Sequence, residues 1–149
     1  RNINIPESSR TKRIVQDLSR AATGIIIDNI QNIICRQLKS RRQIEITLAL
    51  KKLLSEDSHI NRRPSYYAQL LHISPVYLNE VVKNITGTTA SKYIQDEIIL
   101  RAKRMLIYTT LSIKEIAFNL GFDDHTYFTR LFTQTAGLSP TTYRKKYLE

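Results

Sequence analysis

The chain has 149 residues, of which 42% are hydrophobic, with four glycines, four prolines and a formal net charge of +10. This composition excludes a disordered tail, and the length suits one compact domain or two small ones. No apolar run approaches the roughly 20 residues that a membrane-spanning helix needs, so we expect a soluble protein without a membrane partner. The charge excess, +7 in residues 1–63 and +3 in residues 64–149, fits either a polyanionic partner or ordinary solvated helix faces.

The N-terminal part, residues 1–43, is predicted to hold an extended lead-in and two amphipathic helices. Residues 1–10 show little periodicity, and the apolar helical face that follows them is interrupted at Gly24. A second apolar series from Ile26 to Leu38 has helical spacing and ends in the basic run Arg36–Arg42. These helices carry more apolar surface than a linker needs. They are either the remnant of an upstream sensing or dimerising region, which we favour, or a cover for the next domain.

The termini and the sulfur-containing residues restrict the remaining classes. The chain opens at Arg1 and its one methionine is Met105, so we expect a piece of a longer polypeptide, and no signal peptide is visible. The single cysteine, Cys35, lies among isoleucines and is predicted to be a buried core residue. Together with the three histidines it shows no metal-ligand spacing, so we expect neither a metal nor a cofactor.

Residues 44–149 are predicted to form a second domain that holds a first helix-turn-helix motif over about 65–86. An amphipathic helix over Ile44–Leu54 opens this domain, and a polar stretch separates it from the motif. The first helix of the motif covers Ser65–Leu71. Ser74 has the character of an N-cap, and a proline follows it at the first helical position, so the second helix begins there.

A long linker helix over about 89–108 and a second motif over about 112–136 come next. At about 1.5 Å per residue the linker spans roughly 30 Å, close to one turn of B-form DNA. Side chains that can accept hydrogen bonds from unpaired backbone amides mark the helix starts of the second motif: Ser112 with Glu115 as a capping box, then Asp123 or Asp124. A terminal helix over about 140–147 completes the domain.

The two motifs repeat each other residue by residue. Residues of the first recur in the second at an offset of 49 or 50 positions: Ala68, Tyr77, Leu78, Gly87 and Tyr93 match Ala117, Tyr127, Phe128, Gly137 and Tyr143. A chain that builds this unit twice is suited to grip one extended polymer at two places, so the repeat favours the polyanionic partner. The predicted fold class is all-α, with two helix-turn-helix subdomains joined by a long linker helix and preceded by extra N-terminal helices.

Apolar positions inside the motifs predict small helical cores. They are Leu71, Ile73, Leu78 and Val81 in the first motif, and Ile113, Ile116, Leu120, Phe122, Phe128, Leu131 and Phe132 in the second. Five tyrosines form a second group: Tyr66, Tyr67, Tyr93, Tyr127 and Tyr143. Aromatic side chains can stack on bases, but because these tyrosines have helical spacing, we interpret them as core residues with a hydrated hydroxyl.

Three segments in and around the second motif are specific enough to point to a family. They are Ser112-Ile-Lys-Glu-Ile-Ala117, Gly121-Phe-Asp-Asp-His-Thr-Tyr-Phe-Thr-Arg-Leu-Phe132 and Ala136-Gly-Leu-Ser-Pro-Thr-Thr-Tyr-Arg144. In these segments, and over about residues 44–147, the chain resembles the C-terminal DNA-binding domain of AraC/XylS-type bacterial transcription regulators. The version with Ile-Leu-Arg-Ala-Lys-Arg-Met-Leu before the second motif is similar to members common in Bacteroides-like bacteria.

The resemblance implies sequence-specific binding to double-stranded DNA, with one recognition helix of each motif in successive major-groove segments. In the second recognition helix it implies DNA contacts by His125, Thr126, Thr129 and Arg130. Arg130 is the strongest candidate for a base contact, because a guanidinium can bridge guanine O6 and N7. The alternatives are a phosphate contact or an ion pair with Asp123 or Asp124 for Arg130, and a phosphate contact or a solvated surface position for His125.

The first recognition helix carries the matching positions Val76, Asn79, Glu80 and Lys83. Asn79 is a candidate to read adenine bidentately, and Lys83 is expected to hold a phosphate. Glu80 departs from the family pattern, in which arginine is frequent, and a carboxylate is repelled by DNA unless it accepts from cytosine N4. Glu97, in the linker helix, is likewise acidic where relatives often carry a basic residue.

Two other function classes remain as alternatives to a transcription regulator. An enzyme of the DNA-repair alkyltransferase kind needs a cluster of cysteines, which this chain lacks. An interaction module with weak or non-specific DNA binding, dimerised through residues 11–40, is kept open by Glu80. For the favoured class, the resemblance implies a transcription activator that contacts RNA polymerase. The apolar N-terminal helices, or a region upstream of them, are candidates for a homodimer contact, and we expect the protein in the cytoplasm with the nucleoid.

Overall fold

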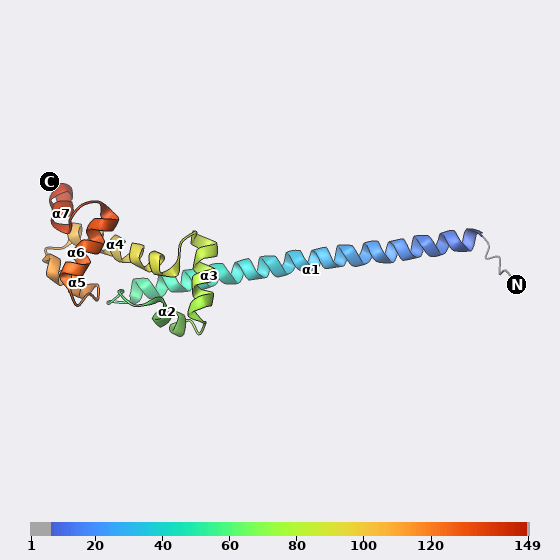
Figure 1. Cartoon of the computed structure of the whole chain (residues 1–149), viewed down its shortest axis with the longest axis horizontal. Coiled ribbons are helices and arrows are strands. Elements are labelled where there is room, and N and C mark those ends of the chain that lie inside the picture. Colours follow the sequence, from blue (N-terminus) through green and yellow to red (C-terminus); the bar gives the residue numbers. More distant parts are fainter. Residues whose placement is uncertain (1–6, 149) are drawn as a thin grey trace. The chain divides into compact units, whose positions relative to one another are not determined.

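A computed structural model describes residues 7–148 of the chain, and this range is helical with short connections and no strands. Figure 1 shows its helices in chain order: α1 Glu7–Glu56, α2 Pro64–Leu70, α3 Pro75–Thr86, α4 Ala90–Tyr108, α5 Ile113–Asn119, α6 His125–Ala136 and α7 Pro140–Leu148. The all-α fold class is confirmed. The chain divides into two compact units, residues 1–42 and residues 43–149, and α1 contributes to both.

Helix α1 is continuous over 50 residues, which corrects three expectations. Gly24 does not interrupt it, and the helix predicted over Ile44–Leu54 is its last part rather than a separate element. The extended lead-in is wrong from Glu7 onward, and residues 1–6 lie outside the described range. A glycine inside a helix costs about 1 kcal/mol relative to alanine, and the long runs of helix-compatible residues on both sides offset that cost.

Side chains 11–42 in the first unit are exposed along their whole length. They include large apolar residues that remain about half exposed or more: Ile14, Val15, Leu18, Ile25, Ile26, Ile27, Ile30, Ile33, Ile34 and Leu38. Cys35 is also exposed, so its prediction as a core residue is wrong. The apolar neighbours that suggested burial lie on the same helix, where they cannot cover one another.

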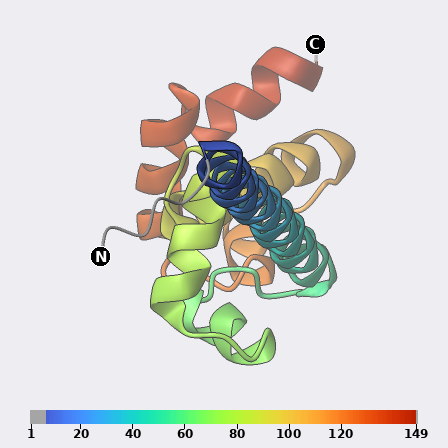
Figure 2. The same cartoon turned by 90° about the vertical axis from the view of Figure 1, so that its right-hand side faces the viewer.

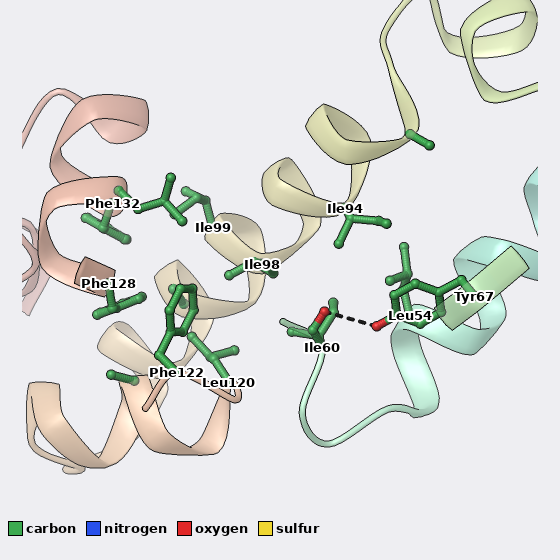
Figure 3. Packing of buried hydrophobic residues seen from close by; sticks show 14 of the residues in the cluster. Leu54, Ile60, Tyr67, Ile94, Ile98, Ile99, Leu120, Phe122, Phe128 and Phe132 are labelled. Carbon is green, nitrogen blue, oxygen red and sulfur yellow. Dashed lines mark hydrogen bonds between the residues drawn. The ribbon is translucent and has the colours of Figure 1, made fainter. Parts of the chain in front are cut away.

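The second unit has one continuous hydrophobic core that extends through both motifs. Most of the residues that the sequence placed in the motif cores are buried, and Leu71, Ile73 and Ile113 are partly buried against them. Helix α4 joins the two sides: Figure 3 shows Ile94 toward Tyr67, Ile98 in the middle and Ile99 toward Phe132. The core is therefore shared rather than divided into two small clusters.

Both motifs make their turn with the same backbone hydrogen bonds. The amide of Ile73 donates to the carbonyl of Ala68 over 3.0 Å, and the amide of Phe122 donates to that of Ala117 over 3.0 Å. The residue before each donor has a positive φ, 54° at His72 and 87° at Gly121. The sequence repeat therefore corresponds to a repeat of backbone geometry, with a strained histidine in the first turn where the second has glycine.

Helices α3, α4, α5 and α6 each begin with a side-chain cap. The hydroxyl of Ser74 accepts from the amide of Tyr77, and the hydroxyl of Thr89 accepts from that of Lys92. Ser112 and Glu115 form the predicted capping box, with the amide of Ser112 donating to a Glu115 carboxylate oxygen over 2.7 Å. These hydrogen bonds from Ser112 hold the pKa of Glu115 below its ordinary value. Asp124 caps α6.

Two arginines in the second unit donate hydrogen bonds to backbone carbonyls at or just beyond the C-terminal ends of helices. The Arg101 guanidinium of α4 donates to the carbonyls of Leu54 and Ser55, over 2.8 Å each, and to that of Asp57. Arg144 of α7 donates to the carbonyls of Leu106 and Leu111 over 3.0 and 2.6 Å. The last carbonyls of a helix lack partners within the helix, so a cationic donor there both satisfies them and complements the helix dipole. Helix α7 lies beside α6, as Figure 1 and Figure 2 show.

Candidate nucleic-acid interface

Helix α3 has one buried face and one exposed face, as a recognition helix requires. Its inner side chains, Leu78, Val81 and Val82, are fully buried. The predicted contact residues Val76, Asn79, Glu80 and Lys83 are all exposed. Val76 is 80% exposed although it is apolar, and it lies in the first turn of the helix, whose residues approach base edges in helix-turn-helix complexes.

Asn79 has a structural partner that the sequence did not reveal. Its side-chain oxygen accepts a hydrogen bond from the amide of Ala90 over 3.0 Å, at the first residue of α4. This bond joins the recognition helix to the linker helix. An asparagine that reads adenine bidentately needs both its oxygen and its nitrogen, so the observed bond disfavours the adenine contact expected for Asn79.

Helix α6 has the same division into faces. Phe128, Leu131 and Phe132 are buried, with the Phe128 and Phe132 ring centroids 5.9 Å apart. The predicted contact residues on the other side are His125, Thr126, Thr129 and Arg130, which are exposed except for the half-buried Thr129. The Thr129 hydroxyl donates to the carbonyl of His125 over 2.8 Å, so its proton is used within the helix.

The N-terminus of α6 is capped by a carboxylate rather than left open. A side-chain oxygen of Asp124 accepts a hydrogen bond from the amide of Thr126 over 2.8 Å. This hydrogen bond is the main reason why the pKa of Asp124 is lower than its ordinary value. The carboxylate is therefore ionised near neutral pH. It occupies the position that a phosphate takes at an uncapped helix start, so the capped amide is not available to an anion.

Arg130 lies against an aromatic ring instead of pairing with an aspartate. Its guanidinium carbon is 5.6 Å from the ring centroid of Tyr127, and no ion pair joins it to Asp123 or Asp124 in the described part of the chain. Together with Asp124 and Thr126, these two residues line a small hollow of about 180 Å³. Tyr127 is 48% exposed and Tyr66 is 40% exposed, so the interpretation of these two tyrosines as core residues is wrong. Tyr67 is fully buried, as expected for a core residue, but its hydroxyl bonds to Ile60 and Asp57.

A larger cleft of about 380 Å³ adjoins this hollow and was not predicted from the sequence. Its lining comes from the loop before α2, from the first turns of α4 and from α6, and it includes Arg62, Lys92, Gln95 and Tyr127. The Lys92 ammonium pairs with Asp96 at 2.9 Å. Arg62, Lys92 and Gln95 lie outside both motifs and far from Tyr127 in sequence, so only the packing of the helices brings these four residues together.

Helix α4 sets the scale of the interface. Its 19 residues correspond to about 28 Å at 1.5 Å per residue, comparable with one turn of B-form DNA.

Among the residues that the structure describes, no cluster of histidine, cysteine and carboxylate side chains is able to hold a metal ion. No helix in that part of the chain is long and apolar enough to cross a membrane.

Comparisons with known proteins agree with this arrangement. A family model described as a helix-turn-helix domain matches residues 67–146. The HTH-type transcriptional regulator YfiF of Bacillus subtilis is 32% identical over 152 residues, covering 95% of this chain and 46% of that protein. The chain therefore spans about half the length of this curated relative.

Solved structures share the fold. The C-terminal domain of AraT, a response regulator from Geobacillus stearothermophilus, is 29% identical with a TM-score of 0.62, covering 68% of this chain and 84% of that one. The DNA-binding domain of AdpA, a global transcriptional factor in complex with a target DNA, matches with a TM-score of 0.58 at 23% identity, covering 70% of this chain and 91% of that one. This chain belongs to the AraC/XylS-type family of helix-turn-helix transcription regulators and carries the DNA-binding domain of that family, which is not a family of enzymes.

Proposed function

We propose that this chain reads a specific sequence in double-stranded DNA through two recognition helices, α3 and α6, placed in successive major-groove segments. The observation that carries the proposal is the duplicated helix pair, in which each second helix buries one face in a shared core and exposes the other. The AdpA domain, which has the same fold, is seen in complex with a target DNA. The excess of basic residues supplies the sequence-independent part of the affinity.

In the second motif, Arg130 is the principal base-reading residue. Its contact with the Tyr127 ring holds the guanidinium at the surface without using its hydrogen-bond donors, which leaves them for guanine. His125 and Thr126, in the first turn of α6, contribute a further base or phosphate contact. Thr129 is restricted by the hydrogen bond that its hydroxyl donates to the backbone.

The first motif reads DNA less specifically. Val76 supplies an apolar contact suited to a thymine methyl group, and Lys83 supplies a phosphate contact. Asn79 acts mainly through its bond to Ala90, and Glu80 repels phosphate unless cytosine N4 faces it. Arg62 and Lys92 in the cleft beside α6 hold the sugar-phosphate backbone.

Selection from a pool of random duplexes at near-physiological salt tests the proposal. Enrichment of two short elements about one helical turn apart is expected. One enriched element would restrict base reading to a single motif. No enrichment, combined with a steep salt dependence, would contradict sequence-specific reading and support the alternative of an interaction module with non-specific DNA affinity.

Arg130→Ala is expected to weaken binding to the selected duplex by about 1–3 kcal/mol, because a bidentate contact to guanine is lost. The matched control is Arg104→Ala, which removes an equal charge from an exposed position on α4. Affinities for the selected duplex and for a scrambled one measure the effect. An equal loss on both duplexes would reduce Arg130 to a phosphate contact.

We further propose that the chain acts as a transcription activator in the bacterial cytoplasm and touches RNA polymerase when bound to DNA. The arabinose operon regulatory protein of Escherichia coli, 34% identical over 77 residues that cover 52% of this chain and 26% of that protein, is a regulator of an operon. Transcription from a promoter that carries the selected site, with and without this chain, tests the activity. A fall in transcript at saturating protein would contradict activation.

The exposed face of α1 is proposed to pair with a second copy of this chain. Ile26, Ile30 and Ile33 alternate spacings of four and three, the pattern of a coiled-coil seam, and each is about half exposed or more. This length of amphipathic helix has no partner element within the first unit, since that unit consists of α1 alone over its described residues.

Ile30→Lys is expected to abolish this dimer, because it places a charge in the seam. Asn29→Lys, one residue away on a polar position of the same helix, is the control and leaves association unchanged. Sedimentation equilibrium over a range of concentrations gives the mass, which for the monomer is 17.3 kDa. A monomeric mass for the unmodified chain at every concentration, or equal behaviour of both variants, would contradict the dimer.

A further inference from the structure

The segment between α1 and α2 reaches the turn of the second motif, far along the chain. The amide of Asn61 donates to the carbonyl of Leu120 over 3.0 Å, and the side-chain nitrogen of Asn61 donates to the carbonyl of Gly121 over 3.3 Å. The ring of His59 meets that of Phe118 edge to face, with centroids 6.2 Å apart. A loop that precedes the first motif is thus bound to the turn of the second.

The same segment is fastened to the first motif and to the linker helix. The Tyr67 hydroxyl of α2 lies 3.0 Å from the carbonyl oxygen of Ile60 and 3.1 Å from a carboxylate oxygen of Asp57, and donates to these acceptors. Figure 3 shows the bond between Tyr67 and Ile60. Burial, followed by the Asp57 charge, raises the pKa of Tyr67, so the phenol keeps its proton. Arg101 of α4 donates to the carbonyl of Asp57.

Gly121 allows the loop and the turn to approach closely. A Cβ atom added there would lie 3.1 Å from the Cβ of His59 and 3.3 Å from its backbone Cα and carbonyl carbon. None of these atoms can rotate away, because two belong to the backbone and the Cβ is fixed directly to it. Gly137 has a similar φ, 76° against 87°, but a Cβ added there would meet nothing within 4 Å. The two glycines therefore share a backbone requirement and differ in the contact.

We propose that the loop Asp57–Asn61 is a positioning clamp that fixes the distance and angle between the two recognition helices, with Asn61 and Gly121 as its positioning residues. The loop is bonded to α2, to α4 and to the turn between α5 and α6, so it connects the two motifs by contacts additional to the covalent path through the linker helix α4. This inference rests on the proposed reading of DNA by both motifs. Two linked binding modules gain affinity only when their geometry allows both to engage, and the gain reaches about 10²–10⁴.

The test compares Gly121→Ala with Gly137→Ala on three kinds of duplex: both selected elements at their selected spacing, the same elements with one or two base pairs inserted, and the second element alone. The unmodified chain and Gly137→Ala are expected to bind the paired site much more tightly than the single element and to lose this advantage when the spacing changes. Gly121→Ala is expected to bind the single element normally, while its advantage on the paired site falls by about tenfold or more and depends little on spacing. An equal loss on single and paired sites would overturn the clamp.

A milder pair of variants covers the case in which Gly121→Ala does not fold. Asn61→Ala removes only the hydrogen bond from the Asn61 side chain to the carbonyl of Gly121. Ser58→Ala changes the same loop, but the Ser58 hydroxyl bonds to the neighbouring His59 ring and not to the turn of the second motif. A smaller loss of the paired-site advantage is expected for Asn61→Ala and none for Ser58→Ala. Identical profiles for both would overturn the proposal.

A distance measurement separates failure of the clamp from failure of the DNA proposal. Spin labels at Asn84→Cys on α3 and Thr133→Cys on α6, in a Cys35→Ser background, report the distance between the recognition helices without DNA. A narrow distance distribution is expected for the otherwise unmodified chain and for Gly137→Ala, and a broad or shifted one for Gly121→Ala. If selection enriches no DNA sequence, the proposal that both motifs read DNA fails. The distance distributions still show, without DNA, whether the clamp fixes the two recognition helices relative to each other. Equal distributions for the two glycine variants would overturn it.

Discussion

Phe132→Ala is expected to lower the free energy of unfolding of the second unit by about 3–5 kcal/mol, the usual cost of removing a large aromatic side chain from a well-packed core. Phe132 is fully buried, with ring centroids 5.9 Å from Phe128 and 5.5 Å from Tyr143. It thus joins α6 to α7, and its loss leaves a cavity between these two helices. Urea unfolding followed by circular dichroism measures the effect.

Phe118→Ala is the matched control for this prediction. Phe118 is 68% exposed on α5, so its removal leaves no internal cavity, and a change of less than about 1 kcal/mol is expected. If the two phenylalanine variants lose the same stability, the assignment of Phe132 to the shared core is wrong. Because Phe132 lies on the recognition helix, its variant is also expected to bind DNA less tightly once the unit begins to unfold.

Arg101→Ala is expected to lower the free energy of unfolding by about 2–3 kcal/mol, since carbonyls at the end of α1 then lose a charged donor. The guanidinium donates over 2.8 Å to Leu54 and to Ser55, and it also meets the Asp57 carbonyl. The side chain is partly buried, so water replaces these bonds only in part. The midpoint of urea unfolding is the measurement.

Two variants distinguish the hydrogen bonds of Arg101 from its charge. Arg104→Ala removes an exposed charge from the same helix and is expected to change stability by less than about 0.5 kcal/mol. Arg101→Lys keeps the charge but lacks the planar fork, so it is expected to recover only part of the loss. Full recovery with lysine would show that charge near the helix end, rather than the set of hydrogen bonds, stabilises the junction.

The sequence by itself determined the local structure of the second unit and its family. The starts of helices can be predicted from side chains such as Ser74, Ser112 and Asp124, which accept a hydrogen bond from a backbone amide two or three residues later. The motif cores can be predicted from the spacing of apolar residues. Both features depend on residues within a few positions of each other. The exposed contact face of α6 follows in the same way from the buried face opposite it. The family was equally readable, since its motifs are local strings of residues.

The tertiary structure alone decided which side chains serve contacts between elements. Asn79, which looked like a base reader, binds the first amide of α4, and Arg101 meets the end of α1 across 46 positions of sequence. Burial also depends on what packs against a helix: Cys35 has apolar neighbours along α1 but no covering element in the described first unit, so it is exposed. Local patterns set which face of a helix is apolar, whereas the partner that covers that face, and the clamp from Asn61 to Gly121, arise only when distant segments meet.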